Sequence, residues 1–197
     1  MHYSTRAFSK SGMTTIEALD QAFQETIGQR ISLSFYDIKT LNQAYCSNVC
    51  VTRPLACTND GYSDPTDCSK CRCPEGLGGT LCEQPQTSTD ANCGGTLVAQ
   101  PGWATLTAVG TGRSRRCYWI INAPGGRVEY QIQEVVFECS ETCVHYLELK
   151  TTERFELNGP RYCCQAPTTS IVSAGEKSIL IFRGKLETSF QLRYRKV

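Results

Sequence analysis

Histidine is scarce in this sequence, and its scarcity excludes several kinds of catalysis. Only two histidines, His2 and His145, occur in 197 residues, and neither lies within a catalytic or metal-binding motif. A serine or cysteine nucleophile needs an adjacent base, most often histidine, and zinc hydrolases hold their metal with several imidazoles. These 197 residues alone are therefore not expected to form either kind of hydrolase.

An excess of one charge and long apolar runs are also missing. Twenty basic and nineteen acidic side chains give a net charge of +1, which is too balanced for the phosphate neutralisation that drives nucleic-acid binding. The longest apolar runs, such as Ile179 to Phe182, are far shorter than the roughly 20 residues needed to span a bilayer. We expect no nucleic-acid partner and no membrane anchor.

Cysteine, in contrast, is abundant, with thirteen residues in the chain. Persistent disulfides need an oxidising compartment, so this content predicts a secreted or extracellular protein. Zinc binding is the competing interpretation, because Cys68 and Cys71 form a Cys-x-x-Cys pair. A structural zinc site would need a second pair at a workable distance, and the adjacent Cys163 and Cys164 suit tetrahedral ligation poorly. We therefore favour disulfides.

The first residues do not have the features of an export signal. The sequence from Met1 to Ser9 contains no apolar segment of the length that such a signal requires. A secreted protein with this many cysteines should be exported through one. We expect either that processing has removed a signal or that the sequence begins within a longer protein.

Cysteine spacing and composition divide the chain into three segments and a linker. We name them the N-terminal segment (residues 1–46), the cysteine-rich segment (residues 47–83) and the C-terminal segment (residues 93–197). The linker, residues 84–92, is polar and contains Pro85. It is expected to run as an exposed connector.

The N-terminal segment contains one clear helix signal. Ser34 and Asp37 fit a capping box, in which a hydroxyl and an acid three residues later satisfy free amide groups. Apolar residues then follow at helical spacing, which predicts a helix from about Phe35 to Tyr45. A segment of this size with one short helix cannot bury a sizeable core, so it must pack against something else.

The cysteine-rich segment is expected to depend on crosslinks. It has few large apolar side chains, and each disulfide in a small secreted domain stabilises it by about 2 to 5 kcal/mol. Turn-forming residues occur throughout, including Asn59-Asp60-Gly61 and Asp64-Pro65. The cysteines are thus predicted to replace a conventional core.

The C-terminal segment reads as a series of strands without a helix. Val128, Tyr130 and Ile132 alternate with polar residues, which is typical of a strand with one buried face. A two-sheet antiparallel β-sandwich is the simplest architecture for this pattern. The fold class is therefore mostly β and multi-domain. The predicted strands cover residues 118–121, 128–137, 146–149, 178–182 and 189–194.

The spacing of the six cysteines in the cysteine-rich segment resembles that of the EGF-like module. It ends in Cys73-x8-Cys82 with Gly76 and Gly79 between them. Spacing alone permits fifteen connectivities for six cysteines. The resemblance implies one of them, which pairs Cys50 with Cys68, Cys57 with Cys71, and Cys73 with Cys82.

The C-terminal segment resembles a CUB domain along its whole length. The matching features are Cys93-Gly-Gly at its start, the run from Cys117 to Pro124, and Phe190 to Tyr194 at its end. The resemblance implies a bond between Cys93 and Cys117. Two further bonds would join the remaining cysteines in an order that the sequence leaves open: Cys139, Cys143, Cys163 and Cys164.

Many CUB domains bind calcium, but this sequence departs from the pattern. His145, before Tyr146, takes the place of an acidic ligand in that family. Calcium strongly prefers carboxylate and carbonyl oxygens, so no calcium site is predicted despite Glu134 and Glu138 nearby. His145 is expected to be an ordinary surface or packed imidazole, and Glu138 and Glu141 are expected to be solvated acids.

The N-terminal segment resembles the last part of an astacin-family metalloprotease domain. Met1-His2-Tyr3, Ala7 to Ser9 and the run from Leu33 to Cys46 carry this resemblance. It implies that Met1 is the methionine beneath the zinc site and that Tyr3 is a vestigial zinc ligand. His2 would not be a ligand.

The same resemblance explains the odd number of cysteines. In that family the last cysteine of the catalytic domain bonds to one near its beginning, so Cys46 is expected to be unpaired here. Complete members bind zinc through a His-Glu-x-x-His-x-x-Gly-x-x-His helix, in which the glutamate activates the metal-bound water. The sequence contains no such helix. We expect no zinc bound to this chain and no activity from it as given.

Three functional hypotheses follow. The favoured one is that the chain is the C-terminal portion of a secreted astacin-like zinc metalloendopeptidase with extracellular protein substrates. The second is a stand-alone secreted binding module with EGF-like and CUB parts that contacts extracellular proteins or matrix. The third is an inert decoy that competes with full-length relatives for their partners.

Overall fold

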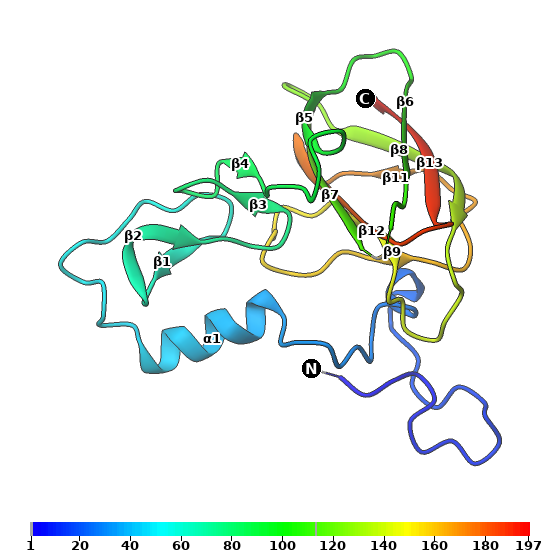
Figure 1. Cartoon of the computed structure of the whole chain (residues 1–197), viewed down its shortest axis with the longest axis horizontal. Coiled ribbons are helices and arrows are strands. Elements are labelled where there is room, and N and C mark those ends of the chain that lie inside the picture. The colour runs from blue at the N-terminus through cyan, green and yellow to red at the C-terminus, as the bar shows by residue number, and fades with distance from the viewer. Residues whose placement is uncertain (1, 113) are drawn as a thin grey trace.

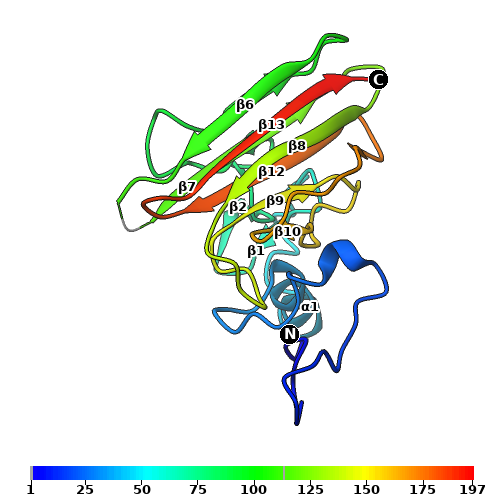
Figure 2. The same cartoon turned by 90° about the vertical axis from the view of Figure 1, so that its right-hand side faces the viewer.

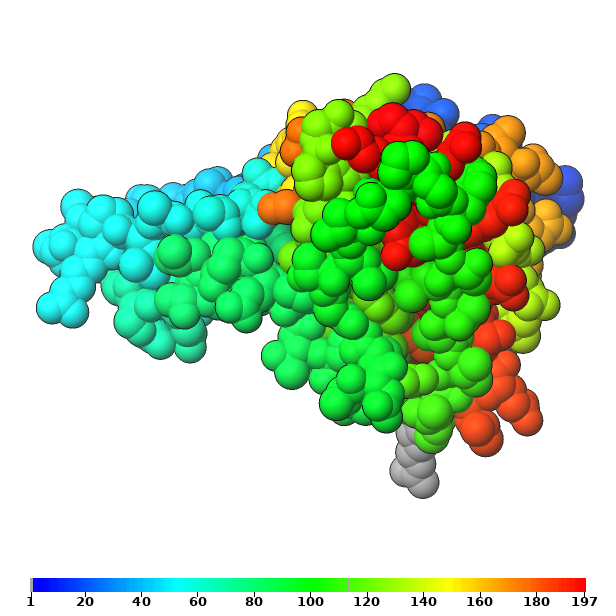
Figure 3. Space-filling model, turned by 90° about the horizontal axis from the view of Figure 1, so that it is seen from above, coloured from blue at the N-terminus to red at the C-terminus, as the bar shows by residue number. Residues whose placement is uncertain are grey.

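The computed structural model describes residues 2–112 and 114–197 of the chain (Figure 1). A β-sandwich forms the larger body, and the cysteine-rich segment projects from one side of it, with helix α1 (Phe35–Tyr45) beneath (Figures 1 and 3). A short 3₁₀ helix, Gln21–Phe23, precedes α1. The mostly β prediction is confirmed. The strands are β1 (Tyr62–Asp64), β2 (Asp67–Arg72), β3 (Leu77–Gly78), β4 (Gln84–Pro85), β5 (Gly95–Val98), β6 (Ala104–Val109), β7 (Arg115–Asn122), β8 (Val128–Val136), β9 (Tyr146–Lys150), β10 (Arg161–Tyr162), β11 (Ile171–Val172), β12 (Lys177–Gly184) and β13 (Ser189–Lys196).

The C-terminal segment folds into two sheets that face each other (Figure 2). The five-stranded sheet has the order β10-β9-β12-β7-β5, and the four-stranded sheet has the order β11-β8-β13-β6. The prediction of a wholly antiparallel sandwich is wrong at one edge, where β5 runs parallel to β7. Parallel neighbours need a crossover, and β6, which lies in the opposite sheet, supplies it.

The sandwich core is built by the alternation that the sequence predicted. Val128, Tyr130 and Ile132 of β8 are buried, and so are Phe190 and Leu192 of β13. Trp119, Leu147, Leu180 and Phe182 from the five-stranded sheet belong to the same hydrophobic cluster. Burial of each large apolar side chain stabilises the fold by roughly 1.5 to 3 kcal/mol.

The cysteine-rich segment is not held by crosslinks alone. Its Leu77, together with Cys71 and Cys82, is buried against Ile179 and Ile181 of β12. The approach is close, because a Cβ on Gly76 would lie 2.5 Å from a methyl carbon of Ile179. The outer face of the five-stranded sheet is therefore covered as well as its inner face, which explains why β7 and β12 are nearly continuous apolar runs.

Three disulfides link the strands and turns of the cysteine-rich segment. They join Cys50 to Cys68, Cys57 to Cys71, and Cys73 to Cys82. These are the pairs that the resemblance to the EGF-like module implied. A fourth bond joins Cys93 to Cys117 at the start of the sandwich.

The linker is largely exposed, as its polar composition predicted, but it also contacts the parts of the chain that it joins. Gln84 and Pro85 form β4, which pairs with β3. Ser88 accepts a hydrogen bond from the Tyr118 amide at 3.1 Å, and Asp90 forms an ion pair with Arg115 at 2.8 Å. Nothing in the sequence indicated that Ser88 and Asp90 would bind strand β7.

Helix α1 spans the predicted residues. Both capping-box hydrogen bonds between Ser34 and Asp37 are present, so that prediction is confirmed. No residue of α1 is buried. The helix is attached by polar contacts: Asn42 donates to the Tyr62 hydroxyl at 2.7 Å, and Lys39 binds the Asp60 carbonyl at 3.0 Å and the Glu156 carboxylate.

Candidate functional site

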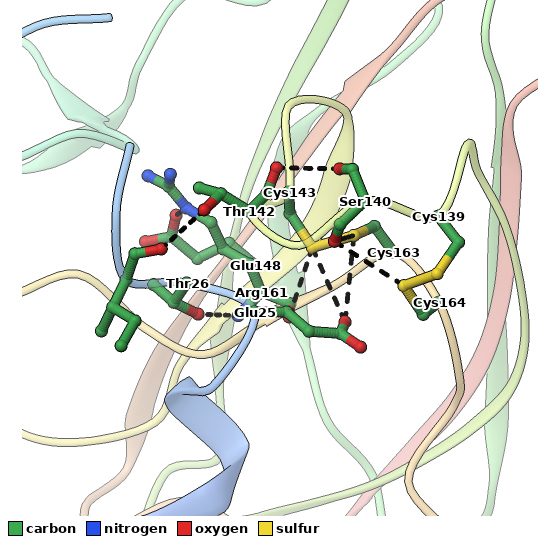
Figure 4. The surroundings of a disulfide bond; sticks show 11 residues. Glu25, Thr26, Cys139, Ser140, Thr142, Cys143, Glu148, Arg161, Cys163 and Cys164 are labelled. Carbon is green, nitrogen blue, oxygen red and sulfur yellow. Dashed lines mark hydrogen bonds and ion pairs between the residues drawn. A yellow bond between two sulfur atoms is a disulfide. The ribbon is translucent and has the colours of Figure 1, made fainter. Parts of the chain in front are cut away.

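Two neighbouring disulfides hold one loop of the C-terminal segment, which we name the doubly crosslinked loop. Cys139 bonds to Cys164, and Cys143 bonds to Cys163, so residues 139–143 are joined to two adjacent cysteines (Figure 4). The sequence left this pairing order open. Which cysteine of the loop pairs with Cys163 and which with Cys164 depends on how the tertiary fold places the loop beside β10. Residues close in the sequence do not determine this placement.

A buried ion pair between Arg161 and Glu148 lies next to this loop. The Arg161 Nε lies 2.8 Å from a carboxylate oxygen of Glu148, whose other oxygen accepts from the Gly159 amide at 2.9 Å. Both side chains are almost completely buried, and the guanidinium lies 4.2 Å from the centre of the Tyr146 ring. Burial opposes the charge on Arg161, but the attraction of Glu148, Tyr146 and Glu75 and the hydrogen bond to Glu148 together raise the pKa of Arg161. The pair fixes β9 to β10.

The N-terminal segment docks onto the doubly crosslinked loop through its backbone. The Cys143 amide donates to the Glu25 carbonyl at 2.9 Å, and the Thr142 hydroxyl donates to the Ile27 carbonyl at 2.8 Å. The Thr26 hydroxyl accepts from the Arg161 amide at 2.9 Å (Figure 4). Sequence reasoning missed this contact, because backbone groups form most of it and leave no side-chain signal.

A second contact joins the two segments nearby. One carboxylate oxygen of Glu141 accepts from the Thr5 hydroxyl at 2.8 Å and from the Arg6 amide at 2.6 Å. The hydrogen bond from Thr5 lowers the pKa of Glu141 below its ordinary value. Glu141 is exposed, as expected of a solvated acid, but it also binds the start of the chain, which the sequence did not predict. Glu138 forms an exposed ion pair with Lys185 at 2.8 Å.

The structure does not bring the zinc-related residues together. Tyr3 is half exposed, and its ring packs edge-on against Phe8 at 5.6 Å. His2 is exposed, with its Nδ1 2.9 Å from the Tyr3 carbonyl, whereas His145 lies in the sandwich just before β9. Met1 lies outside the described residues. Two histidines in different segments and one exposed phenol do not fit a zinc site.

Only one group of potential metal-ligating residues is gathered within the described parts of the chain. It consists of Glu25, Cys163 and Cys164. Both sulfurs are in disulfides and cannot serve as thiolate ligands, so this group does not fit a metal either. Cys46, at the C-terminal end of α1, is the one cysteine of residues 2–112 and 114–197 without a disulfide.

His145 is a partly buried imidazole on the surface of the sandwich. Burial lowers its pKa, and the positive charges of Lys185 and Arg183 lower it further. Such surroundings favour the neutral ring. The absence of a calcium site near His145, Glu134 and Glu138 stays a prediction.

Comparison with known proteins supports the resemblance seen in the N-terminal segment. Residues 1–46 match the family model described as Astacin, which is a peptidase family. No helix among the described residues has the length and apolar content to cross a bilayer.

Relatives cover the whole chain. Zinc metalloproteinase nas-37 of Caenorhabditis elegans is 40% identical over 203 residues, which are 100% of this chain and 26% of that protein. Zinc metalloproteinase dpy-31 of Haemonchus contortus is 41% identical over 93% of this chain and 35% of that protein. Zinc metalloproteinase nas-36 of C. elegans is 40% identical over 95% of this chain and 32% of that protein.

Solved structures align with about half of the chain. The MASP-1 CUB2 domain bound to Ca²⁺ aligns with 52% of this chain and 99% of its own, at 21% identity and a TM-score of 0.41. The CUB1-EGF-CUB2 domains of rat MASP-1 align with 52% of this chain and 42% of their own, at 17% identity and a TM-score of 0.42. The chain spans about a quarter to a third of the length of the curated relatives named above. Over its full length, therefore, it is a relative of nematode astacin-type zinc metalloproteinases.

Proposed function

We propose that this chain is the accessory, C-terminal portion of a secreted astacin-like zinc metalloendopeptidase that cleaves extracellular proteins. The observation that carries the proposal is the Astacin match over residues 1–46, continued by 40% identity to nas-37 along the entire chain. Six disulfides suit an extracellular setting. The cysteine-rich and C-terminal segments would be EGF-like and CUB modules that position substrate.

The exposed apolar side chains of the N-terminal segment support this assignment. Tyr36, Leu41 and Tyr45 of α1 are exposed, and Phe8 is 87% exposed. Large apolar groups gathered on one small segment are typical of a surface that packs against another part of a protein. The rest of a metalloprotease domain is the partner that the family match implies.

The 197 residues themselves are proposed to be inactive, because they contain no zinc-binding helix. The test compares the purified chain with a fusion that carries the zinc-binding region of nas-37 before residue 1. With zinc present, the chain should leave a protein substrate intact, and the fusion should cleave it. Cleavage by the chain alone, abolished by a chelator, would contradict the proposal of inactivity.

Transcript sequence upstream of the Met1 codon tests the assignment of the gene. A reading frame that encodes a His-Glu-x-x-His helix, continuous with this chain, is expected. A stop codon in frame directly before Met1 in every transcript would reject the assignment.

A stand-alone secreted binding module is the second candidate. One observation favours it: the cysteine-rich and C-terminal segments share a hydrophobic cluster that includes Leu77, Tyr118 and Ile179. Two modules that bury a common cluster can form one rigid binding unit. Secretion of the unmodified chain as a folded monomer would favour this function over the first.

A further inference from the structure

A polar cavity lies where all parts of the chain meet. Its volume is about 350 Å³, and residues of the N-terminal segment, the cysteine-rich segment, the linker and the sandwich line it. Residues 29–38 approach it from one side, Arg72 and Glu75 from another, and Tyr118 and Tyr146 come from the five-stranded sheet. None of the segments could form this cavity alone.

Positive charge dominates the cavity. Five cationic side chains line it, but only two carboxylates do. Four of the five cations are arginines, whose planar forks bind oxyanions through paired hydrogen bonds. The cations are Arg72, Arg116, Lys150, Arg161 and Arg183, and the carboxylates are Glu75 and Glu156.

Several of these cations have no carboxylate partner. Arg161 is paired with Glu148, and Glu156 is paired with Lys39 and Arg154 from outside the cavity. Within the described residues, Arg72, Arg116 and Arg183 form no ion pair, and Glu75 forms none either. The cavity therefore has unpaired positive charge in excess of its single unpaired carboxylate.

The surroundings strengthen electrostatic attraction in the cavity. Lys150 is only 3% exposed, and its ammonium group donates to one carbonyl, that of Phe155, at 2.9 Å. Burial lowers the pKa of Lys150, as expected for a cation taken out of water. An anion that entered here would meet several cations in a medium that screens charge less than water does.

We propose that this cavity binds a tetrahedral oxyanion of the sulfate or phosphate type, with Arg72, Arg116 and Arg183 as its ligands. Its volume exceeds that of a free ion, so it also accommodates the group to which a sulfate or phosphate ester is attached. Arg72 ends β2 and Arg183 lies in β12, so the anion would join the cysteine-rich segment to the sandwich. The site does not depend on the proposed protease function.

Binding is tested on the full chain by NMR titration at constant ionic strength, with sodium sulfate and sodium phosphate in separate experiments and sodium chloride as the control. We expect saturable shifts at the amides of Arg72, Arg183 and residues 29–38 with sulfate or phosphate, but not with chloride. The separate titrations show which oxyanion binds more tightly. Wild-type chain without saturable shifts in either titration would overturn the proposal.

Matched arginine variants locate the site. Arg72→Gln and Arg183→Gln should each weaken binding about tenfold, the typical effect of losing a charge-assisted hydrogen bond. Arg53→Gln and Arg127→Gln remove exposed arginines outside the cavity and should leave the affinity unchanged. If the cavity variants and the control variants weakened binding equally, binding would depend only on the net charge of the chain. That result would contradict a specific site in the cavity.

A gain of affinity separates the site from a purely structural charge cluster. Glu75 is the unpaired carboxylate among the cations, so Glu75→Gln should remove a repulsive charge and strengthen oxyanion binding. A variant that merely disrupted folding could not produce this result. If Glu75 instead serves as the internal counter-ion, the wild-type chain will show no saturable titration and only Glu75→Gln will bind the oxyanion, and the proposal is wrong.

Discussion

The N-terminal and C-terminal segments are held in place by different forces. Of the described residues in the N-terminal segment, Thr5 alone is buried, whereas the sandwich encloses an extensive apolar cluster between its two sheets. The N-terminal segment is attached by hydrogen bonds and ion pairs at its surface. Each of these contributes only about 1 kcal/mol net, because water competes for the same groups. The sandwich should therefore set global stability, while the N-terminal segment opens locally.

Loss of a core ring should produce the largest effect. Phe182 is fully buried, with ring centres 5.9 Å from Phe137 and 5.5 Å from Phe190. Phe182→Ala should lower the free energy of unfolding by about 3 to 5 kcal/mol in a denaturant titration. The matched control is Phe8→Ala, which removes an 87% exposed ring. This variant should change the free energy of unfolding by no more than about 0.5 kcal/mol. Similar losses from both variants would contradict the view that the sandwich core, and not the N-terminal segment, sets global stability.

Removal of a disulfide should produce the next largest effect and sharpen the boundary of the core. The double variant Cys57→Ala and Cys71→Ala should destabilise the cysteine-rich segment by about 2 to 5 kcal/mol. Amide hydrogen exchange should speed up in β1 and β2 before it does in β8 and β13. Cys46→Ala, which breaks no disulfide, is the control and should leave the exchange pattern unchanged. Uniform loss of protection would show that both segments unfold as one unit.

A smaller effect is expected at the helix cap. Ser34→Ala removes the hydroxyl that accepts from the Asp37 amide at 3.1 Å, which should cost α1 about 0.5 to 2 kcal/mol. Hydrogen exchange in α1 should become faster while the thermal midpoint of the sandwich is unchanged. Ser47→Ala, an exposed position just after the helix, serves as the control. A fall in the midpoint would mean that α1 stabilises the sandwich more than its exposure suggests.

The smallest effect is expected from pH. The pKa of Glu141 is lower in the folded chain than its ordinary value of 4.5, so the contact with Thr5 is complete above pH 4.5. The contact is lost as pH falls through the lowered pKa, because a protonated carboxyl group is a weaker hydrogen-bond acceptor for Thr5 and Arg6 than the carboxylate. Amide shifts of Thr5 and Arg6 should follow this titration while those of β13 do not. Glu141→Gln should remove the pH dependence, and its persistence would point to another acid.

Local signals in the sequence predicted several elements well. The start of α1 follows from Ser34 and Asp37, because a capping box depends on residues three apart and needs no information from the rest of the fold. The alternation of Val128, Tyr130 and Ile132 predicted which face of β8 is buried, because side chains of a strand alternate between its two faces. Both features are decided within a few residues of chain.

Features that depend on distant partners were not predictable in the same way. The linker has a polar composition whether Ser88 and Asp90 bind water or strand β7. The docking of residues 25–27 on the doubly crosslinked loop uses mainly backbone groups, which every sequence possesses. Strand β5 gave no sign that it would run parallel to β7, because its direction depends on the crossover through β6.

The sequence by itself determined the mostly β class, the helix with its cap, and the family resemblance of residues 1–46. It also determined that only two histidines are available, which limits any chemistry of these residues alone. The tertiary structure alone decided how Cys139 and Cys143 pair with the adjacent Cys163 and Cys164. It also created the cationic cavity, because Arg72 and Arg183 are more than a hundred residues apart and meet only when the outer face of the sheet is covered.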